Sequence, residues 1–247
     1  MTRIGLQLYT VRGECARDLE GTLRTVADLG YEGVELHDLY GRSAQELREL
    51  LDGLGLVVAG RHVSLDVDVE RLAEEQRVLG CDRVALAWID PPESSADADE
   101  SVQRIAALAA RARDAGLRFG FHNHWGELAR LEDGTTLLDR LCELPADLLW
   151  LELDLGWGWD AGESPVRLLE WMRGRTPLVH VKDLRARGTR EHVPVGEGAV
   201  GYADIVPRAA ELGVEWLIVE QDELDRPPAE AIERSIHSVR DALEAAA

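Results

Sequence analysis

Hydrophobic residues follow two different patterns along this chain. Short apolar runs typical of buried strands begin near eight positions: Ile4, Glu32, Val57, Arg83, Leu117, Leu149, Pro177 and Trp216. Between these runs the apolar residues recur at helical spacing; Leu19, Leu23 and Val26, for example, share one face of a helix. The alternation of strand and helix predicts a parallel sheet whose strands are connected by helices.

Glycine marks the predicted ends of five helices. In each case a Leu-Gly or Ala-Gly pair precedes a predicted strand, and the glycines are Gly30, Gly55, Gly80, Gly116 and Gly213. Glycine adopts the left-handed conformation that commonly closes a helix at little steric cost. These positions therefore predict where one helix ends and the next strand begins.

Eight strand–helix repeats in 247 residues predict one α/β domain over residues 1–247, a (β/α)8 TIM barrel. An open doubly wound sheet is the alternative. That fold usually has a glycine-rich phosphate loop after its first strand, whereas residues 8–12 read Leu-Tyr-Thr-Val-Arg. Two loop-like stretches, 90–97 and 185–200, follow predicted strands four and seven, so they are expected on the rim where barrel enzymes keep their sites.

Composition narrows the classes of partner. The chain has 47 acidic and 27 basic residues, so its formal net charge is −20, which argues against nucleic-acid binding. No apolar run reaches the length of a membrane span, and the first residues lack the pattern of a signal peptide. The three cysteines have no metal-binding or disulfide-framework spacing. We therefore expect a cytoplasmic protein without nucleic-acid or membrane partners.

Ionisable side chains gather where the predicted strands end. The strand ends carry His37, His62, His122, His124, Asp154, His180, Lys182 and Glu220. Because these ends meet at one rim of a barrel, the imidazoles and carboxylates can converge on one divalent cation, and this donor mixture suits Mn²⁺, Fe²⁺, Co²⁺ or Zn²⁺ better than Ca²⁺. Glu152 shares a strand face with Asp154 and is expected deeper in the barrel, paired with a neighbour.

Several ordered motifs carry a resemblance to a known family. They are Gly5–Arg12, Gly30–Glu35, Phe121–His124, Leu153–Trp157, Val179–Asp183, Val195–Gly198 and Val219–Asp222. In this order and spacing the chain resembles, nearly end to end, the sugar phosphate isomerase/epimerase family of the xylose-isomerase-like TIM barrel superfamily. Each motif alone is weak, and together they indicate the family far better than the substrate.

The resemblance implies a metal site. In that family four strand-end residues, usually Glu, Asp, His and Glu, hold one divalent ion. The last three correspond to Asp154, His180 and Glu220, and His122 stands where the first Glu is usual. The expected ligands are therefore His122, Asp154, His180 and Glu220, or three of these with water. Mn²⁺ is the favoured ion, with Zn²⁺, Co²⁺, Fe²⁺ or Mg²⁺ as alternatives.

Catalytic and substrate-binding roles follow from the chemistry of proton transfer next to a carbonyl. Glu220 is the candidate base, and His122 or His124 is the candidate second acid or base. Substrate contacts are expected from five further residues: Glu35, His62, Trp157, Lys182 and Glu197. Among these, Trp157 would stack on a sugar ring, and Glu197 would orient a ligand or a hydroxyl.

The leading functional hypothesis is a metal-dependent sugar isomerase or epimerase that acts through an enediolate. The alternative is a metal-dependent lyase or dehydratase acting on inosose or 3-oxo-glycoside substrates. His122 favours it modestly, because the paired-glutamate proton shuttle of the ketose epimerases is not intact here. A non-catalytic sugar-binding barrel is a third hypothesis, and the acidic charge argues against a barrel endonuclease. A carbohydrate partner is expected, and assembly into a homo-oligomer stays open.

Overall fold

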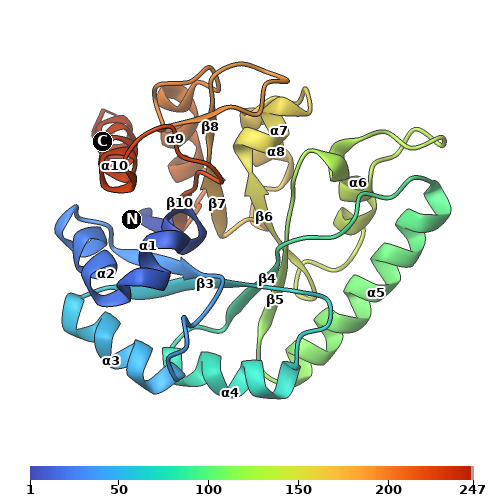
Figure 1. Ribbon diagram of the computed structural model, residues 1–247. Helices are drawn as coiled ribbons and strands as arrows, with labels where there is room; N and C mark the ends of the chain where they lie inside the picture. Colours follow the sequence, from blue (N-terminus) through green and yellow to red (C-terminus); the bar gives the residue numbers. More distant parts are fainter. Residues whose placement is uncertain (246–247) are drawn as a thin grey trace.

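A closed barrel of eight parallel strands forms the centre of the molecule in a computed structural model that describes residues 1–245 (Figure 1). The strands follow one another around the barrel in the order β1-β10-β7-β6-β5-β4-β3-β2, and β2 pairs with β1 to close it. Their bounds are β1 Arg3–Gln7, β2 Gly33–Leu36, β3 Val57–Val63, β4 Arg83–Leu86, β5 Arg118–His122, β6 Trp150–Asp154, β7 Leu178–Val181 and β10 Trp216–Val219. The predicted TIM barrel is confirmed, and all eight apolar runs are strands of it.

Helices surround the barrel and connect its strands (Figure 1). They are α1 Arg12–Arg17, α2 Leu19–Asp28, α3 Ala44–Leu54, α4 Val69–Leu79, α5 Ser95–Asp114, α6 Leu137–Cys142, α7 Leu155–Asp160, α8 Pro165–Trp171, α9 Tyr202–Glu211 and α10 Pro228–Glu244. Two single-turn helices, η1 Leu8–Val11 and η2 Gly126–Leu128, follow β1 and β5. No helix within residues 1–245 is both long and apolar enough to cross a membrane.

The glycines predicted to close helices all adopt positive φ angles. Gly55, for example, has a φ of 71° after α3, and its N–H bonds to carbonyls of the last helical turn. The start of α3 is fixed by Ser43 and Glu46, which cap each other's backbone N–H groups in a reciprocal box. The helix boundaries thus follow from local chemistry that is readable in the sequence.

The two predicted loops contain more regular structure than expected. Helix α5 begins at Ser95, because the Ser94 side chain accepts a hydrogen bond from the Asp97 N–H and caps the helix. The stretch 185–200 contains β9, His192–Val193, which pairs with β8, Asp183–Leu184, as a two-stranded ribbon. This ribbon holds the segment after β7 close to the barrel rim.

The lower half of the barrel interior is an apolar floor. It is formed by Ala59, Ala85, Trp150, Leu178, Trp216 and Ile218. The two indole rings fit because glycines face them: a Cβ on Gly33 would lie 2.7 Å from the Trp216 ring, and a Cβ on Gly120 would overlap the Trp150 ring. The floor closes this end of the barrel. The polar side chains nearer the carboxyl ends of the strands can therefore be reached only from the opposite end.

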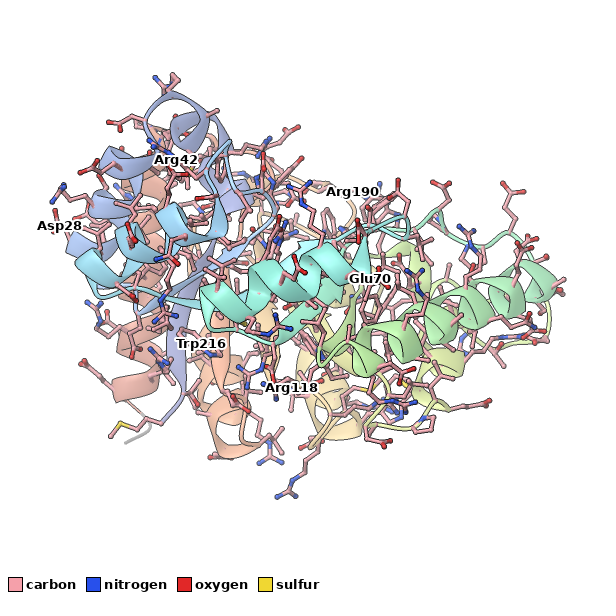
Figure 2. All side chains as sticks on the ribbon, turned by 90° about the horizontal axis from the view of Figure 1, so that it is seen from below. Asp28, Arg42, Glu70, Arg118, Arg190 and Trp216 are labelled. Carbon is pink, nitrogen blue, oxygen red and sulfur yellow. The ribbon has the colours of Figure 1, made fainter. Side chains whose placement is uncertain are left out.

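The two ends of the barrel carry different parts of the chain. In Figure 2, Arg118 and Trp216, which begin β5 and β10, lie toward one end of the molecule. Arg42 and Arg190, from the segments after β2 and β7, lie toward the other. The candidate functional residues come from the strand ends at this second end.

Candidate active site

Polar side chains fill the barrel above the apolar floor in two layers. The lower layer consists of Gln7, Glu35, His62, His122, Glu152 and His180. The upper layer consists of Asp154, Lys182, Glu220 and Asp222. Residues two apart on a strand point to the same side, so Glu152 and Asp154 on β6 occupy successive layers.

Carboxylate–imidazole pairs hold the lower layer together. Glu152 Oε2 lies 2.6 Å from His62 Nε2 and 3.2 Å from His122 Nδ1. Glu35 Oε2 lies 2.7 Å from His180 Nε2 and accepts a hydrogen bond of 2.8 Å from the Gln7 amide. Glu152 is thus the deeper, paired carboxylate that the strand register predicts.

The upper layer is built around the Lys182 ammonium. Its Nζ lies 2.8 Å from Glu220 Oε2, 3.1 Å from Asp154 Oδ2 and 2.9 Å from Asp222 Oδ1. The Nζ also lies 4.9 Å from the centre of the Trp157 ring, a cation–π contact. Lys182 has no exposed surface, so three carboxylates compensate one fully buried ammonium.

His180 joins the two layers. Its Nε2 faces Glu35 below, and its Nδ1 lies 2.9 Å from Glu220 Oε2 above. Burial opposes a charge on this ring, but Glu220, Glu152 and Glu35 outweigh burial and raise the His180 pKa well above its usual value. Burial would likewise raise the Glu220 pKa, but Lys182 and His180 outweigh it and hold that pKa well below its usual value. Glu220 is therefore an ionised carboxylate.

Asp154 divides its two oxygens between structure and chemistry. Oδ1 accepts a 2.8 Å hydrogen bond from the Trp157 N–H and caps α7. Oδ2 is buried and faces Lys182, and it has no well-directed hydrogen bond from residues 1–245. Burial raises the Asp154 pKa to about 6, although Lys182 opposes the shift. A buried carboxylate oxygen without a hydrogen bond is suited to a cation.

Four side chains fit a divalent metal ion. His122, Asp154, His180 and Glu220 each offer one ligand atom, and these four atoms lie within 4.8 Å of one another. His122 directs Nε2 toward Asp154 Oδ2 at 4.0 Å. Two imidazoles and two carboxylates form a donor set that suits Mn²⁺, Fe²⁺, Co²⁺ or Zn²⁺. These are the four residues that the sequence assigns as ligands.

A cavity of about 770 Å³ opens above this cluster. Its polar lining includes His62, His122, His124, Glu220 and Asp222. Its aromatic lining consists of Tyr9, Trp88, Trp125 and Trp157. Burial and the nearby Lys182 lower the His124 pKa to about 3, so this imidazole is neutral near pH 7. The cavity thus combines an ionised carboxylate, neutral imidazoles and flat apolar surfaces.

The structure brings most of the predicted site residues to this place. His62, His122, His124, Trp157 and Glu220 line the cavity, and Asp154, His180 and Lys182 lie directly beneath it. Glu35 lies deeper still, bonded to His180, and does not line the cavity.

Glu197, like Glu35, is a predicted substrate-contact residue that does not line the cavity. Its carboxylate pairs with Arg226 and Arg234 on the surface. The loop that carries it is shaped instead by Asp183, whose Oδ2 accepts hydrogen bonds from the N–H groups of Gly196 and Gly198. The Gly-Glu-Gly motif therefore marks a turn around a buried aspartate.

Asp222 and Trp88 line the cavity, although the sequence indicated no functional role for either and predicted that Trp88 packs in the core or against a helix. Asp222 forms an ion pair with Lys182, as Asp154 and Glu220 do. Its position two residues after Glu220 could have indicated that it faces the same side. Trp88 follows β4 and lines the cavity mouth with 47% of its surface exposed. A large aromatic residue directly after a barrel strand was the signal there, because strand ends form the rim.

Comparisons with known proteins agree with this architecture. Residues 23–242 match the family described as xylose isomerase-like TIM barrel. An inosose dehydratase from Geobacillus kaustophilus is 24% identical over 249 residues, which cover 81% of this chain and 79% of that protein. A sugar phosphate isomerase/epimerase structure from Parabacteroides distasonis has a TM-score of 0.84 at 18% identity and covers 96% of this chain and 97% of its own. An L-ribulose 3-epimerase structure has a TM-score of 0.75 at 17% identity, with coverage of 100% and 96%.

Proposed function

This chain belongs to the xylose isomerase-like TIM barrel family, and from that premise we propose that it is a divalent-metal-dependent enzyme that removes a proton next to a carbonyl of a carbohydrate or cyclic polyol. We further propose that the reaction is a dehydration, in which the hydroxyl on the following carbon leaves as water. The observation that carries the proposal is the position of Glu220, an ionised carboxylate that belongs to the metal-compatible cluster and also lines the cavity.

Glu220 is the proposed base. Lys182 and His180 contact its Oε2 from below, which fixes the carboxylate and keeps it ionised. A base must reach the substrate C–H directly, and Glu220 lines the cavity whereas Lys182 and His180 have no exposed surface. A divalent ion bound at the cluster would supply positive charge to the carbonyl oxygen and so stabilise the negative charge that develops there.

The residues at the end of β5 that line the cavity favour elimination over epimerisation. Epimerisation by a pair of glutamates needs a carboxylate on each face of the substrate, and here the β5 residues are His122 and His124. Burial lowers the pKa of both histidines, so both are neutral imidazoles near pH 7 and neither supplies a second carboxylate. One proton acceptor and a neutral imidazole suit a reaction in which one proton is removed and one hydroxyl departs.

The proposed steps conserve atoms and charge. Glu220 takes the proton from the carbon next to the carbonyl, and the electron pair forms an enolate. The carbonyl re-forms as the hydroxyl on the next carbon is expelled, and a proton delivered through the His124 side chain converts it to water. The acid and base exchange protons with solvent afterwards, so the net change is the loss of one water.

The proposed substrate is a cyclic ketopolyol. The similarity to an inosose dehydratase supports this class. The cavity lining agrees, because the Trp125 and Trp157 rings offer flat apolar surfaces beside polar groups. Nothing in this choice requires a phosphate on the substrate.

Epimerisation is the second candidate. The fold-level likeness to an L-ribulose 3-epimerase favours it, as does the ability of an imidazole at His122 or His124 to act as the acid that returns a proton. In this reaction the substrate would keep all its atoms and exchange one hydrogen with solvent.

Product analysis by proton NMR tests the proposal. The metal-stripped protein is incubated with inososes and with ketoses, each with and without Mn²⁺. Metal-dependent loss of water from an inosose supports dehydration, and metal-dependent conversion of a ketose to its epimer supports the second candidate. If no substrate of either class changes in the presence of Mn²⁺, both reactions are rejected for these substrate classes.

A further inference from the structure

A second group of metal-ligating side chains lies below the first. His62, His122, Glu152 and His180 each offer one atom, and these atoms also lie within 4.8 Å of one another. We propose that this chain has a deeper Zn²⁺ site formed by three histidines and one glutamate, and that its occupation excludes the ion of the upper cluster. The proposal goes beyond the reaction above and shares only His122 and His180 with it.

The three distances from Glu152 Oε2 to the imidazole nitrogens are close to the ligand separations of a tetrahedral site. Three imidazole nitrogens surround one oxygen, Glu152 Oε2: His62 Nε2 at 2.6 Å, His122 Nδ1 at 3.2 Å and His180 Nε2 at 3.6 Å. Ligands about 2.0–2.1 Å from a tetrahedral Zn²⁺ lie roughly 3.3 Å from one another. The three separations lie on both sides of that value, so small side-chain rotations bring the four atoms around one ion.

The donor chemistry separates the two sites. Three imidazoles with one carboxylate are typical ligands of Zn²⁺, which prefers nitrogen donors and four-fold coordination. The upper cluster has two carboxylates and a neighbouring Asp222, so it is richer in oxygen and better suited to Mn²⁺ or Mg²⁺. The two layers therefore differ in the ions that they favour.

The surroundings of the lower group match a metal site. Glu35 Oε2 lies 2.7 Å from His180 Nε2 and 3.4 Å from His62 Nε2, so a second carboxylate balances the charge of a divalent ion. Two buried atoms, Glu152 Oε1 and His122 Nδ1, have no hydrogen-bond partner within the described residues. His62 and His122 line the cavity, which gives an ion a route to the lower layer.

The two shared histidines make the sites mutually exclusive. His180 turns Nδ1 to the upper cluster and Nε2 to the lower group, and His122 turns Nε2 upward and Nδ1 downward. A neutral imidazole carries a proton on one nitrogen and a free lone pair on the other. Each ring can therefore ligate in one direction at a time, so Zn²⁺ in the lower site removes two ligands from the upper one.

Metal titration of matched variants of the full chain tests the proposal. Zn²⁺ affinity is measured by competition with a chelator, and Mn²⁺ affinity by calorimetry. His62→Gln and Glu152→Gln each alter only the lower group. Each variant is expected to lower the Zn²⁺ affinity by more than roughly 10–100-fold, the loss that is typical when a residue that only contacts a ligand is replaced. Their effect on Mn²⁺ affinity is expected to be far smaller.

The reciprocal variant is Asp154→Asn combined with Glu220→Gln, which alters only the upper cluster. It is expected to abolish Mn²⁺ binding and to keep Zn²⁺ binding, with one ion per chain and the strong visible absorption of a tetrahedral site when Co²⁺ replaces Zn²⁺. Circular dichroism of each variant verifies that the barrel is folded.

The opposite pattern would overturn the proposal. If Zn²⁺ affinity follows Asp154 and Glu220 and is unchanged in folded His62→Gln and Glu152→Gln proteins, the lower group is a hydrogen-bonded network and not a metal site. Simultaneous binding of Zn²⁺ and Mn²⁺ to one chain would overturn the mutual exclusion. Neither result depends on turnover, so failure of the proposed dehydration and failure of the zinc site remain distinguishable.

Discussion

At the scale of single residues, individual side chains of the site each make two different contacts. Asp154 caps α7 with one oxygen and presents the other to Lys182. His180 contacts Glu35 with one ring nitrogen and Glu220 with the other. These double roles mean that a substitution that removes the polar atoms at either position disturbs both structure and chemistry, whereas Lys182 and Glu127 allow narrower tests.

Replacement of Lys182 tests whether the ammonium and a metal ion neutralise the same carboxylates. Lys182→Met leaves Asp154, Glu220 and Asp222 without their shared cation, and breaking a buried ion pair costs about 3–5 kcal/mol of unfolding free energy. We expect Mn²⁺ to raise the melting temperature more in the variant than in the unaltered protein. Calorimetric melts with and without Mn²⁺ measure both effects, and equal metal-induced shifts in the two proteins would contradict the shared role.

Glu127 predicts a pH dependence of stability. Burial raises its pKa to about 7, one carboxylate oxygen accepts a bond from the His124 N–H, and the other has no partner within the described residues. Because the folded-state pKa exceeds the unfolded value, the contribution of this group is present below about pH 4.5 and is lost as the pH rises through 7.

The variant Glu127→Gln removes this titration. Relative to it, the unaltered protein is expected to lose about 3 kcal/mol of unfolding free energy between pH 4.5 and pH 8, since one pKa unit corresponds to about 1.4 kcal/mol. Urea unfolding at a series of pH values measures the difference. Parallel stability curves for the two proteins would show that the carboxylate does not titrate in this range.

At the scale of elements, α7 sets the position of the upper layer by its close approach to the end of β7. A Cβ added at Gly156 would overlap the Lys182 carbonyl oxygen, which is backbone and cannot rotate away. Gly156→Ala is therefore expected to lower the unfolding free energy by about 1–3 kcal/mol and to displace Lys182. Denaturant unfolding measures the loss.

Gly53→Ala is the matched control for this prediction. Gly53 lies inside α3, and a Cβ there would meet no atom within 4 Å. Alanine in an open helical position is expected to stabilise the protein by about 0.5–1 kcal/mol. If both substitutions change stability in the same direction and by the same amount, the close approach of α7 to β7 is not the cause.

The elements were predictable because their signals are local. Apolar runs, helical spacing and five glycines with positive φ angles define the eight strand–helix units, and these depend on neighbouring residues in the chain. The start of α5 at Ser95 was missed, because a run of Pro, Glu, Ser and Asp reads as loop until the Ser94 cap is seen. The composition of this stretch predicts a loop, but the Ser94 cap starts the helix within it.

The sequence predicted which residues lie together in the site, but it did not predict the contacts between them. Strand ends converge in any barrel, so His122, Asp154, His180 and Glu220 could be grouped from sequence. The contact between Glu35 and His180 joins residues 145 positions apart, and it depends on the exact depth of each strand in the barrel. The sequence also placed Glu197 near the site, because it follows the end of a barrel strand. Ion pairs with Arg226 and Arg234 instead hold its side chain on the surface.

At the scale of the whole molecule, charge separates this chain from a nuclease of similar fold. The formal net charge is −20, which repels a phosphate backbone. We expect no cleavage of a duplex that contains an abasic site, with Mn²⁺ or with Zn²⁺ present. A gel assay with an end-labelled duplex measures this, and metal-dependent strand cleavage would contradict the assignment of a small carbohydrate substrate.

The central claim is that Glu220 removes a proton next to a carbonyl in a metal-dependent reaction. The most direct measurement is solvent deuterium exchange, followed by NMR, at that carbon of an inosose in D₂O. The account predicts exchange or deuterium-labelled product with the Mn²⁺-loaded protein, and neither with the stripped protein or with Glu220→Gln. Equal exchange by the unaltered protein and by folded, metal-loaded Glu220→Gln would contradict it.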